Sequence, residues 1–207
     1  MALIKIQKPQ AEKPAERAHP RDFSGLVAEL SHEKPMSRRW AARDLAEYPE
    51  ATVALVERLK QEPDTSVREV IFTALTHIGH FSAVLGLVEF LHSEDAALRN
   101  EAIDALKQMP DEVAPVMHGM LMDANSDVRI FAVNILESLC HPMVESWLIE
   151  VIESDPHVNV CATAVDLLGE VGSTAAREAL LGLKERFPDE PYVHFAADLA
   201  LRRIDEG

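Results

Sequence analysis

Apolar residues recur along the chain at spacings that place them on one face of an α-helix. In the segment 66–79 (SVREVIFTALTHIG), the first apolar residue is followed by others four, seven, eight and eleven positions later. Because an α-helix turns once every 3.6 residues, this spacing forms one apolar stripe. The pattern predicts amphipathic helices from about residue 22 onward.

This pattern occurs six times, at intervals of 30 to 33 residues. The copies cover 36–49, 66–79, 97–110, 127–140, 159–172 and 192–205. Copies two to four are regular, whereas the first and the last two are looser. Self-similarity at a fixed period is typical of repeat proteins, in which each unit buries its apolar face against its neighbours.

A second amphipathic pattern lies between these copies. It covers 51–61, 81–93, 112–123, 143–154 and 174–187. Pro, Asp, Asn and Ser separate the two helices of each pair, and the polar side chains at those points are expected to cap the following helix. We therefore expect an all-α fold, an α-α superhelix of about six helix pairs over residues 22–207, preceded by a flexible, proline-containing tail over residues 1–21.

The composition supports this fold class and narrows the functions. Hydrophobic residues make up 47% of the chain, which suffices for a buried core. Aromatic residues make up only 5% and there are 8 glycines, both low for a β-sandwich or barrel. No apolar run approaches the 18 residues or so of a membrane span, and the first residues do not form a signal peptide. The sequence predicts a cytoplasmic protein.

The charge is acidic and unevenly distributed. The net charge is −15, from 35 acidic and 20 basic residues. Residues 1–21 contain five basic and two acidic residues, a net charge of +3, which leaves −18 on the rest. Nucleic-acid binders usually carry a basic surface, so this balance argues against nucleic acid and against an anionic membrane. It is compatible with a basic partner.

The repeated segments resemble HEAT repeats, in particular the short bacterial variety called PBS-lyase HEAT-like repeats. The resemblance rests on the D-x-x-V-R-x-x-A-x-x-A-L-x-x-I-G type of second helix and covers residues 22–205. It implies a helical solenoid. The family includes scaffolds, bilin-lyase subunits and a di-iron hydroxylase, so the resemblance does not select one function.

An arginine follows the lead position of the stripe in each of the first four copies: Arg38, Arg68, Arg99 and Arg129; the lead residue is Ser37 in the first copy and apolar in the other three. The last two copies have Cys161 and His194 there. The resemblance implies a structural ladder that ties neighbouring repeats through acids in the turns. The acids expected to take part are Asp64, Asp95 and Asp127. Anion binding is the alternative, and we favour the structural role.

The second helices of such a solenoid line its concave side, which is the expected binding surface. Positions two, three and six after the first apolar residue should point toward it. The candidate binding residues are Trp40, Arg43, Glu69, Thr73, Asn100, Glu101, Asp104, Ile130, Phe131 and Asn134. Large apolar residues at both ends of an acidic middle would suit a basic or amphipathic peptide. The alternative is that Trp40 and Phe131 pack between repeats.

Metal and iron chemistry find little support in the residue pattern. His77 and His80 are three residues apart at a helix end, where capping is the preferred interpretation over metal binding. A di-iron hydroxylase would need several His-Glu pairs, and the sequence offers one, His32-Glu33. We expect no metal and no cofactor.

Catalytic motifs are likewise missing from the sequence. There is no glycine-rich phosphate loop, nucleophile elbow or C-x-x-C motif. Cys161 with His157 suggests an activated thiol, but a buried core cysteine is the preferred interpretation. Cys140 and Cys161 both fall in helical patterns and are expected to be free buried thiols.

We therefore expect a non-catalytic scaffold or adaptor that binds a partner protein, through a basic or amphipathic segment, on an acidic concave surface. The first alternative is an accessory subunit of a bilin (phycocyanobilin) lyase or another chromophore-handling system. The second is an iron-dependent hydroxylase of the HEAT-repeat type.

Overall fold

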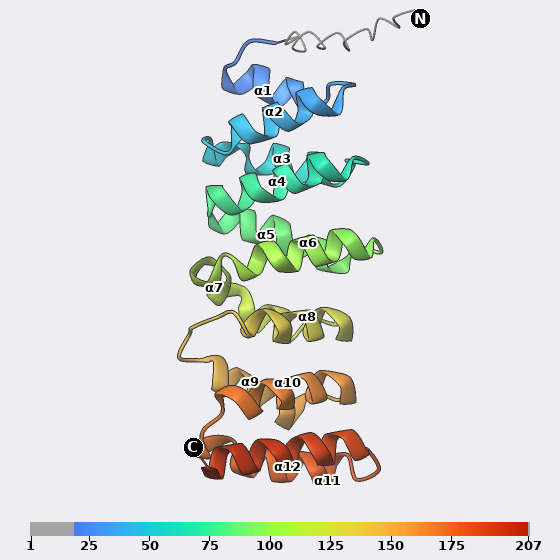
Figure 1. Cartoon of the computed structure of the whole chain (residues 1–207), viewed down its shortest axis with the longest axis vertical. Coiled ribbons are helices and arrows are strands. Elements are labelled where there is room, and N and C mark those ends of the chain that lie inside the picture. The colour runs from blue at the N-terminus through green and yellow to red at the C-terminus, as the bar shows by residue number, and fades with distance from the viewer. Residues whose placement is uncertain (1–18, 207) are drawn as a thin grey trace, which may run out of the picture. The chain divides into compact units, whose positions relative to one another are not determined.

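The computed structural model describes residues 19–206, so most of the expected tail over residues 1–21 lies outside the described residues. Within this range the chain forms twelve α-helices, three short 3-10 helices and no strand (Figure 1). The helices divide into two compact units, up to Ile78 and from Gly79 onward.

Unit 1 contains two helix pairs. The first pair is α1 (Phe23–Glu29) with α2 (Pro35–Leu45), and the second is α3 (Thr52–Leu59) with α4 (Thr65–Ile78). A 3-10 turn (Pro49–Ala51) leads into α3. The helix α2 packs on both α1 and α4, so the second helices of the two pairs lie against each other.

Unit 2 contains four helix pairs. Their elements are α5 (Phe81–Glu89), α6 (Ala96–Lys107), α7 (Pro110–Leu121), α8 (Ser126–Leu136), α9 (Val144–Ser154), α10 (Val158–Val171), α11 (Arg177–Arg186) and α12 (Pro191–Glu206). We call the odd-numbered helices first helices and the even-numbered helices second helices. The second helices α6, α8, α10 and α12 pack in succession.

The first helices of unit 2 are less evenly packed. The helix α5 packs on α7 and α9 packs on α11, whereas α7 and α9 make few contacts. A long connection that contains Pro142 separates α8 from α9, since α8 ends at Leu136 and α9 begins at Val144. The surface is therefore open between α7 and α9.

Polar caps begin several of the helices, as the turn residues predict. The Asp95 carboxylate accepts hydrogen bonds from the backbone amides of Ala97 and Leu98, and the Asn125 side chain accepts one from Asp127. Each bond satisfies a backbone N–H group that has no partner within its own helix. The short polar turns therefore set where the second helices start.

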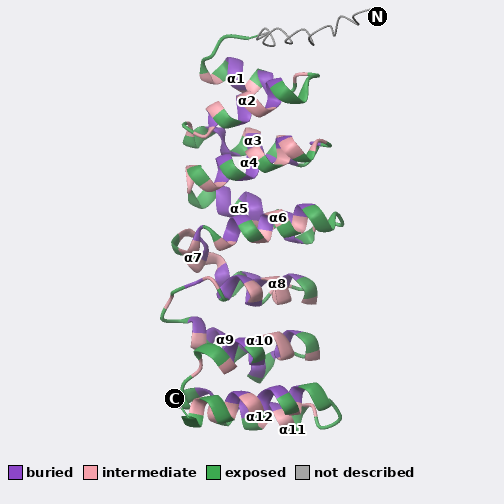
Figure 2. Ribbon diagram, viewed as in Figure 1, coloured by how far each residue is buried: buried purple, intermediate pink, exposed green. Residues whose placement is uncertain are grey.

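The predicted apolar stripe forms the core. In the fourth copy all five stripe residues are buried: Val128, Ala132, Ile135, Leu136 and Leu139. Figure 2 shows these buried surfaces on the helices of both units. Repeated over six helix pairs, this burial is the main stabilising contribution, because each buried Leu or Ile side chain contributes about 1.5–3 kcal/mol.

The all-α fold class and the six helix pairs are confirmed. The second helices begin within one residue of their predicted starts. No described helix is both long and apolar enough to cross a membrane.

The prediction that Cys140 is buried is wrong. Its thiol is exposed, because α8 ends four residues earlier and the chain turns outward before Pro142. Cys161 is buried, as expected.

Candidate functional site

Each of the four ladder arginines donates a hydrogen bond to the backbone carbonyl of the residue six positions earlier. The donor–acceptor distances are 2.8 Å for Arg38 to His32, 2.6 Å for Arg68 to Glu62, 2.6 Å for Arg99 to Ser93 and 2.8 Å for Arg129 to Asp123. Each acceptor lies in the turn that precedes the second helix. The arginine therefore holds that turn against its own helix.

Arg38 also makes a buried ion pair across the two helix pairs of unit 1. Its guanidinium donates to both carboxylate oxygens of Glu62, at 2.6 and 2.7 Å, and Arg58 donates to Glu62 at 2.8 Å. Burial opposes ionisation of Glu62, yet these bonds and a backbone N–H bond from Asp64 hold its pKa below the usual value. The carboxylate is therefore charged and fully paired.

This pairing corrects the acid expected for Arg38. The expected partner, Asp64, instead accepts hydrogen bonds from the backbone amide and hydroxyl of Ser66 at the start of α4. The observed partner, Glu62, lies two residues earlier in the same turn, between α3 and α4. Asp127, a second expected acid, lies exposed in the first turn of α8.

Arg129 makes the corresponding pair in unit 2. Its guanidinium donates to both oxygens of Asp155, at 2.6 and 2.9 Å, and the pair links α8 to the turn before α10. The hydrogen bonds that Arg129 donates to the Asp155 carboxylate raise the pKa of Arg129, so the guanidinium stays charged. With both groups almost fully buried and paired, Arg129 is part of the structure of this region.

Cys161 leaves a gap in the arginine series that another helix fills. Its thiol lies 3.3 Å from the carbonyl oxygen of Asp155, while Arg186 on α11 donates to the same oxygen at 2.6 Å and also to the carbonyl of Ile152. Burial raises the pKa of Cys161 to about 11, so the thiol is neutral near pH 7. A neutral buried thiol is not a nucleophile.

The candidate binding residues divide between the two units. Four lie in unit 1, at 40, 43, 69 and 73, and six lie in unit 2. The exposed ones are Arg43, Glu69, Thr73, Asn100 and Asp104. The half-buried ones are Trp40, Glu101, Ile130, Phe131 and Asn134. The Phe131 ring lies 5.9 Å from the Arg99 guanidinium, so part of its face covers a ladder residue.

A groove of about 220 Å³ runs between the second helices α8 and α10. Val133, Asn134 and Leu167 line it together with Glu137, Thr163, Asp166 and Glu170. Of the candidate binding residues, Asn134 is the one that lines it. The hydroxyl of Tyr192 donates to Asp166 at 2.7 Å, a bond that raises the pKa of Tyr192. Three carboxylates therefore line one groove.

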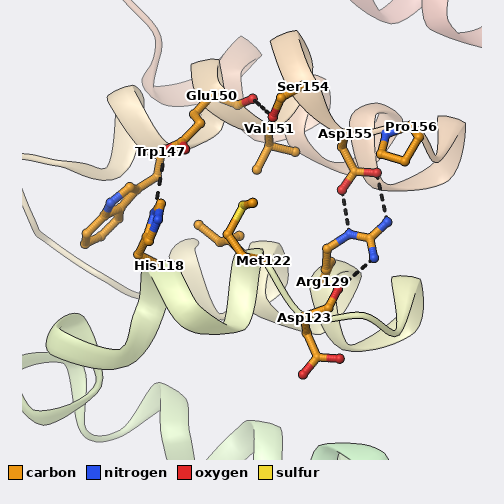
Figure 3. A pocket seen from close by; sticks show the side chains of 11 residues that line it. His118, Met122, Asp123, Arg129, Trp147, Glu150, Val151, Ser154, Asp155 and Pro156 are labelled. Atoms are coloured by element: carbon orange, nitrogen blue, oxygen red, sulfur yellow. Dashed lines mark hydrogen bonds and ion pairs between the residues drawn. The ribbon is translucent and has the colours of Figure 1, made fainter.

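A second, more apolar pocket of about 250 Å³ opens between the first helices α7 and α9 (Figure 3). Leu121, Met122, Trp147 and Val151 form its apolar lining, and the Arg129–Asp155 pair closes one end. This pocket lies on first helices, whereas the binding surface predicted from the sequence lies on second helices. Met122, just after α7, is exposed in this pocket, which helical periodicity does not reveal.

His118 and Glu150 mark the other end of this pocket. Their nearest side-chain atoms, Nδ1 and Oε2, lie 3.7 Å apart, and both side chains are about half exposed. Trp147 stacks on His141 with ring centroids 5.1 Å apart and an interplanar angle of 7°. This stacking fixes the indole that forms one wall of the pocket.

The other histidine candidates are dispersed. His77 lies 3.8 Å from Glu47, and His80 contacts the hydroxyl of Ser82 at 3.2 Å. The Nδ1 atom of His32 accepts a hydrogen bond from the backbone amide of Lys34. Among residues 19–206 no three His, Cys, Asp or Glu side chains form a group that could hold a metal ion.

Similarity to known proteins adds to this geometry. The model of HEAT repeats matches residues 52–121 and 113–202. The uncharacterized phycocyanin operon protein Z of Pseudanabaena tenuis is 24% identical over 187 residues, which cover 86% of this chain and 92% of that protein.

Two solved structures are also similar. The complex of CpcE and CpcF of phycocyanin lyase from Nostoc sp. has 20% identity and a TM-score of 0.39, and the match covers 95% of this chain and 98% of that chain. Human deoxyhypusine hydroxylase has 17% identity and a TM-score of 0.47, with 89% and 84% covered.

The repeat model describes the same helix pairs that the structure shows, and its two matches together extend over residues 52–202, well over half of the chain. The chain therefore belongs to the HEAT-repeat family.

Proposed function

We propose that the chain is a non-catalytic scaffold whose acidic second helices bind a basic or amphipathic segment of a partner protein. The observation that carries this proposal is the groove between α8 and α10, with Glu137, Asp166 and Glu170 along it. Repeat proteins commonly bind extended partners along the surface formed by successive repeats. The side chains in the groove match a segment that carries lysine or arginine.

One further carboxylate, Asp104, lies on the neighbouring second helix α6. Asp104, Asn134 and Asp166 occupy equivalent positions in three successive second helices, six residues after the first apolar residue. Lys107 on α6 lies 3.2 Å from Glu137, which shows how a cationic side chain is held at the edge of the groove. A lysine from a partner would meet the same type of carboxylate at Glu170.

A charge-reversed variant tests this proposal. The double variant Glu137→Lys and Glu170→Lys reverses two groove charges, and its matched control reverses Glu178 and Glu185, which are exposed on α11. Each chain is immobilised and used to capture proteins from the native cell. Proteins lost only from the groove variant are identified, purified and measured for binding at low and high salt.

We expect at least one such protein, with a basic segment and an affinity that falls as salt screens the charges. Partners that bind the groove variant and the native chain equally, or whose affinity is independent of salt, would contradict the proposal.

A second candidate function rests on sequence similarity. The relative from Pseudanabaena tenuis is named for a phycocyanin operon and matches nearly the whole chain. This supports a role as an accessory subunit in attaching a bilin chromophore, in which the partner would be another subunit or the phycocyanin itself. The test is to mix the purified chain with phycocyanobilin and record the absorbance spectrum. An unchanged spectrum would remove chromophore binding by the chain alone.

A further inference from the structure

The pocket between α7 and α9 has a largely apolar lining. Met122 is 62% exposed at its centre, and Leu121, Val151 and Trp147 form the lining. The volume of about 250 Å³ is below the roughly 300–1,000 Å³ of pockets that enclose small-molecule ligands. Methionine adapts its shape to different apolar partners. This pocket therefore suits one or two aliphatic side chains of a peptide.

The helices beside the pocket are strongly acidic. The helix α9 carries three glutamates and no lysine, arginine or histidine, and α7 carries Asp111 and Glu112 with His118 as its one basic residue. Within the pocket lining, Glu150 is about half exposed and Asp123 is partly exposed. An apolar side chain flanked by lysines would match both the lining and these charges.

Residues 3–8 of this chain, LIKIQK, have that chemistry. Three of the six are Leu or Ile, two are Lys and none is acidic, in a part of the chain with a positive net charge. Ile4 and Ile6 are two positions apart, the spacing that places side chains on one side of an extended peptide. Residues 1–21 have a net charge of +3, whereas the remainder of the chain has a net charge of −18.

We propose that the pocket between α7 and α9 binds residues 3–8 of a second copy of this chain. Ile4 and Ile6 enter the apolar lining around Met122, and Lys5 and Lys8 lie toward Glu150 and Asp123. The contact joins two different surfaces, so each copy can both donate a segment and accept one. This site is separate from the acidic groove on the second helices.

Two variants of the full-length chain test this contact. The segment variant carries Ile4→Glu and Ile6→Glu, and the pocket variant carries Met122→Glu and Glu150→Lys. The control variant makes the same exchanges at an exposed pair on α11, Leu181→Glu and Glu185→Lys. Sedimentation velocity over a range of protein concentrations measures association, and circular dichroism confirms that each variant is folded.

We expect the native chain and the control to associate as concentration rises, and each test variant alone to remain monomeric. An equal mixture of the segment and pocket variants should form one-to-one dimers and nothing larger, because one intact segment meets one intact pocket. The affinity of self-association should be at least about tenfold lower for each test variant than for the native chain.

A native chain that stays monomeric, or a mixture of the two variants that does not associate, would overturn the proposal. Association lost in the Glu137→Lys and Glu170→Lys groove variant, but kept in the pocket variant, would also overturn it. This last outcome would place the contact on the second helices. It would not decide the proposed scaffold function, which the capture experiment tests separately.

Discussion

Arg186 on α11 donates a hydrogen bond of 2.6 Å to the backbone carbonyl of Asp155, which lies 31 residues earlier. In the first four pairs the equivalent carbonyl is held by an arginine of the same pair. Where Cys161 replaces that arginine, the next first helix supplies the guanidinium. The interaction is thus kept, while the residue that makes it has moved from one helix to another.

We predict that Arg186→Ala lowers the free energy of unfolding by about 1–2 kcal/mol, because it removes charge-assisted bonds to the Asp155 and Ile152 carbonyls. Urea unfolding followed by circular dichroism measures the change. The control is Arg202→Ala, which removes an exposed bond of 3.2 Å to the carbonyl of Asp198 within its own helix. Equal effects of the two changes would show that Arg186 has no special role.

The buried pair of Arg38 and Glu62 predicts a dependence of stability on pH. Hydrogen bonds from Arg38, Asp64 and Arg58 hold the folded-state pKa of Glu62 below its usual value. Its contribution is therefore fully present above the unfolded-state pKa and is lost as pH falls through the folded-state pKa. Unfolding free energies measured from about pH 7 to about pH 3 should decline as Glu62 takes up a proton.

The variant Glu62→Gln should lack this pH-dependent part of the free energy of unfolding and should be less stable than the native chain at neutral pH. The loss should be about 3 kcal/mol, because the Arg38 charge remains buried without its carboxylate. The matched control is Glu57→Gln, which breaks the exposed pair with Lys60. A pH profile for Glu62→Gln that parallels the native profile below about pH 5 would contradict the assignment.

The two cysteines should differ in reactivity. Cys140 is exposed and should react rapidly with Ellman's reagent, whereas Cys161 is buried and its raised pKa of about 11 keeps the thiol protonated. Native protein should therefore show one fast thiol per chain, and denatured protein should show two. The variant Cys140→Ser should remove the fast phase, and two fast thiols in the native chain would disprove the burial of Cys161.

Two glycine substitutions should have opposite effects. Gly79, which directly follows α4, has φ of 56°, so Gly79→Ala should destabilise the chain by about 1–2 kcal/mol. Gly119 lies inside α7, where an added methyl group meets no atom within 4 Å, so Gly119→Ala should stabilise by about 0.5–1 kcal/mol. Thermal unfolding of both variants measures the signs, and a neutral Gly79→Ala would contradict the conformational argument.

Several parts of this protein could be predicted because their cause is local. The apolar spacing that begins at Val67 or Val128 depends only on the turn of an α-helix, and polar residues such as Asp95 cap the helix that directly follows them. The repeat of this pattern was therefore enough to predict an all-α fold of about six helix pairs and the position of the ladder arginines.

Other features depend on residues that meet only after the helices pack. Arg38 pairs with Glu62, whereas the more obvious turn residue Asp64 accepts hydrogen bonds from Ser66 at the start of α4. The break in the ladder at Cys161 indicated a lost interaction, but its spacing did not reveal that Arg186 would replace it.

The pocket between α7 and α9 likewise arises from the spacing of two first helices, and no residue pattern along one helix encodes that distance. Helical periodicity is a property of neighbouring residues, so it was readable from the sequence. Residues about 25 to 35 positions apart meet in the hydrogen bonds of Arg129 and Arg186 and in the pocket around Met122. Only the packing of whole helices in the tertiary structure brings such residues together.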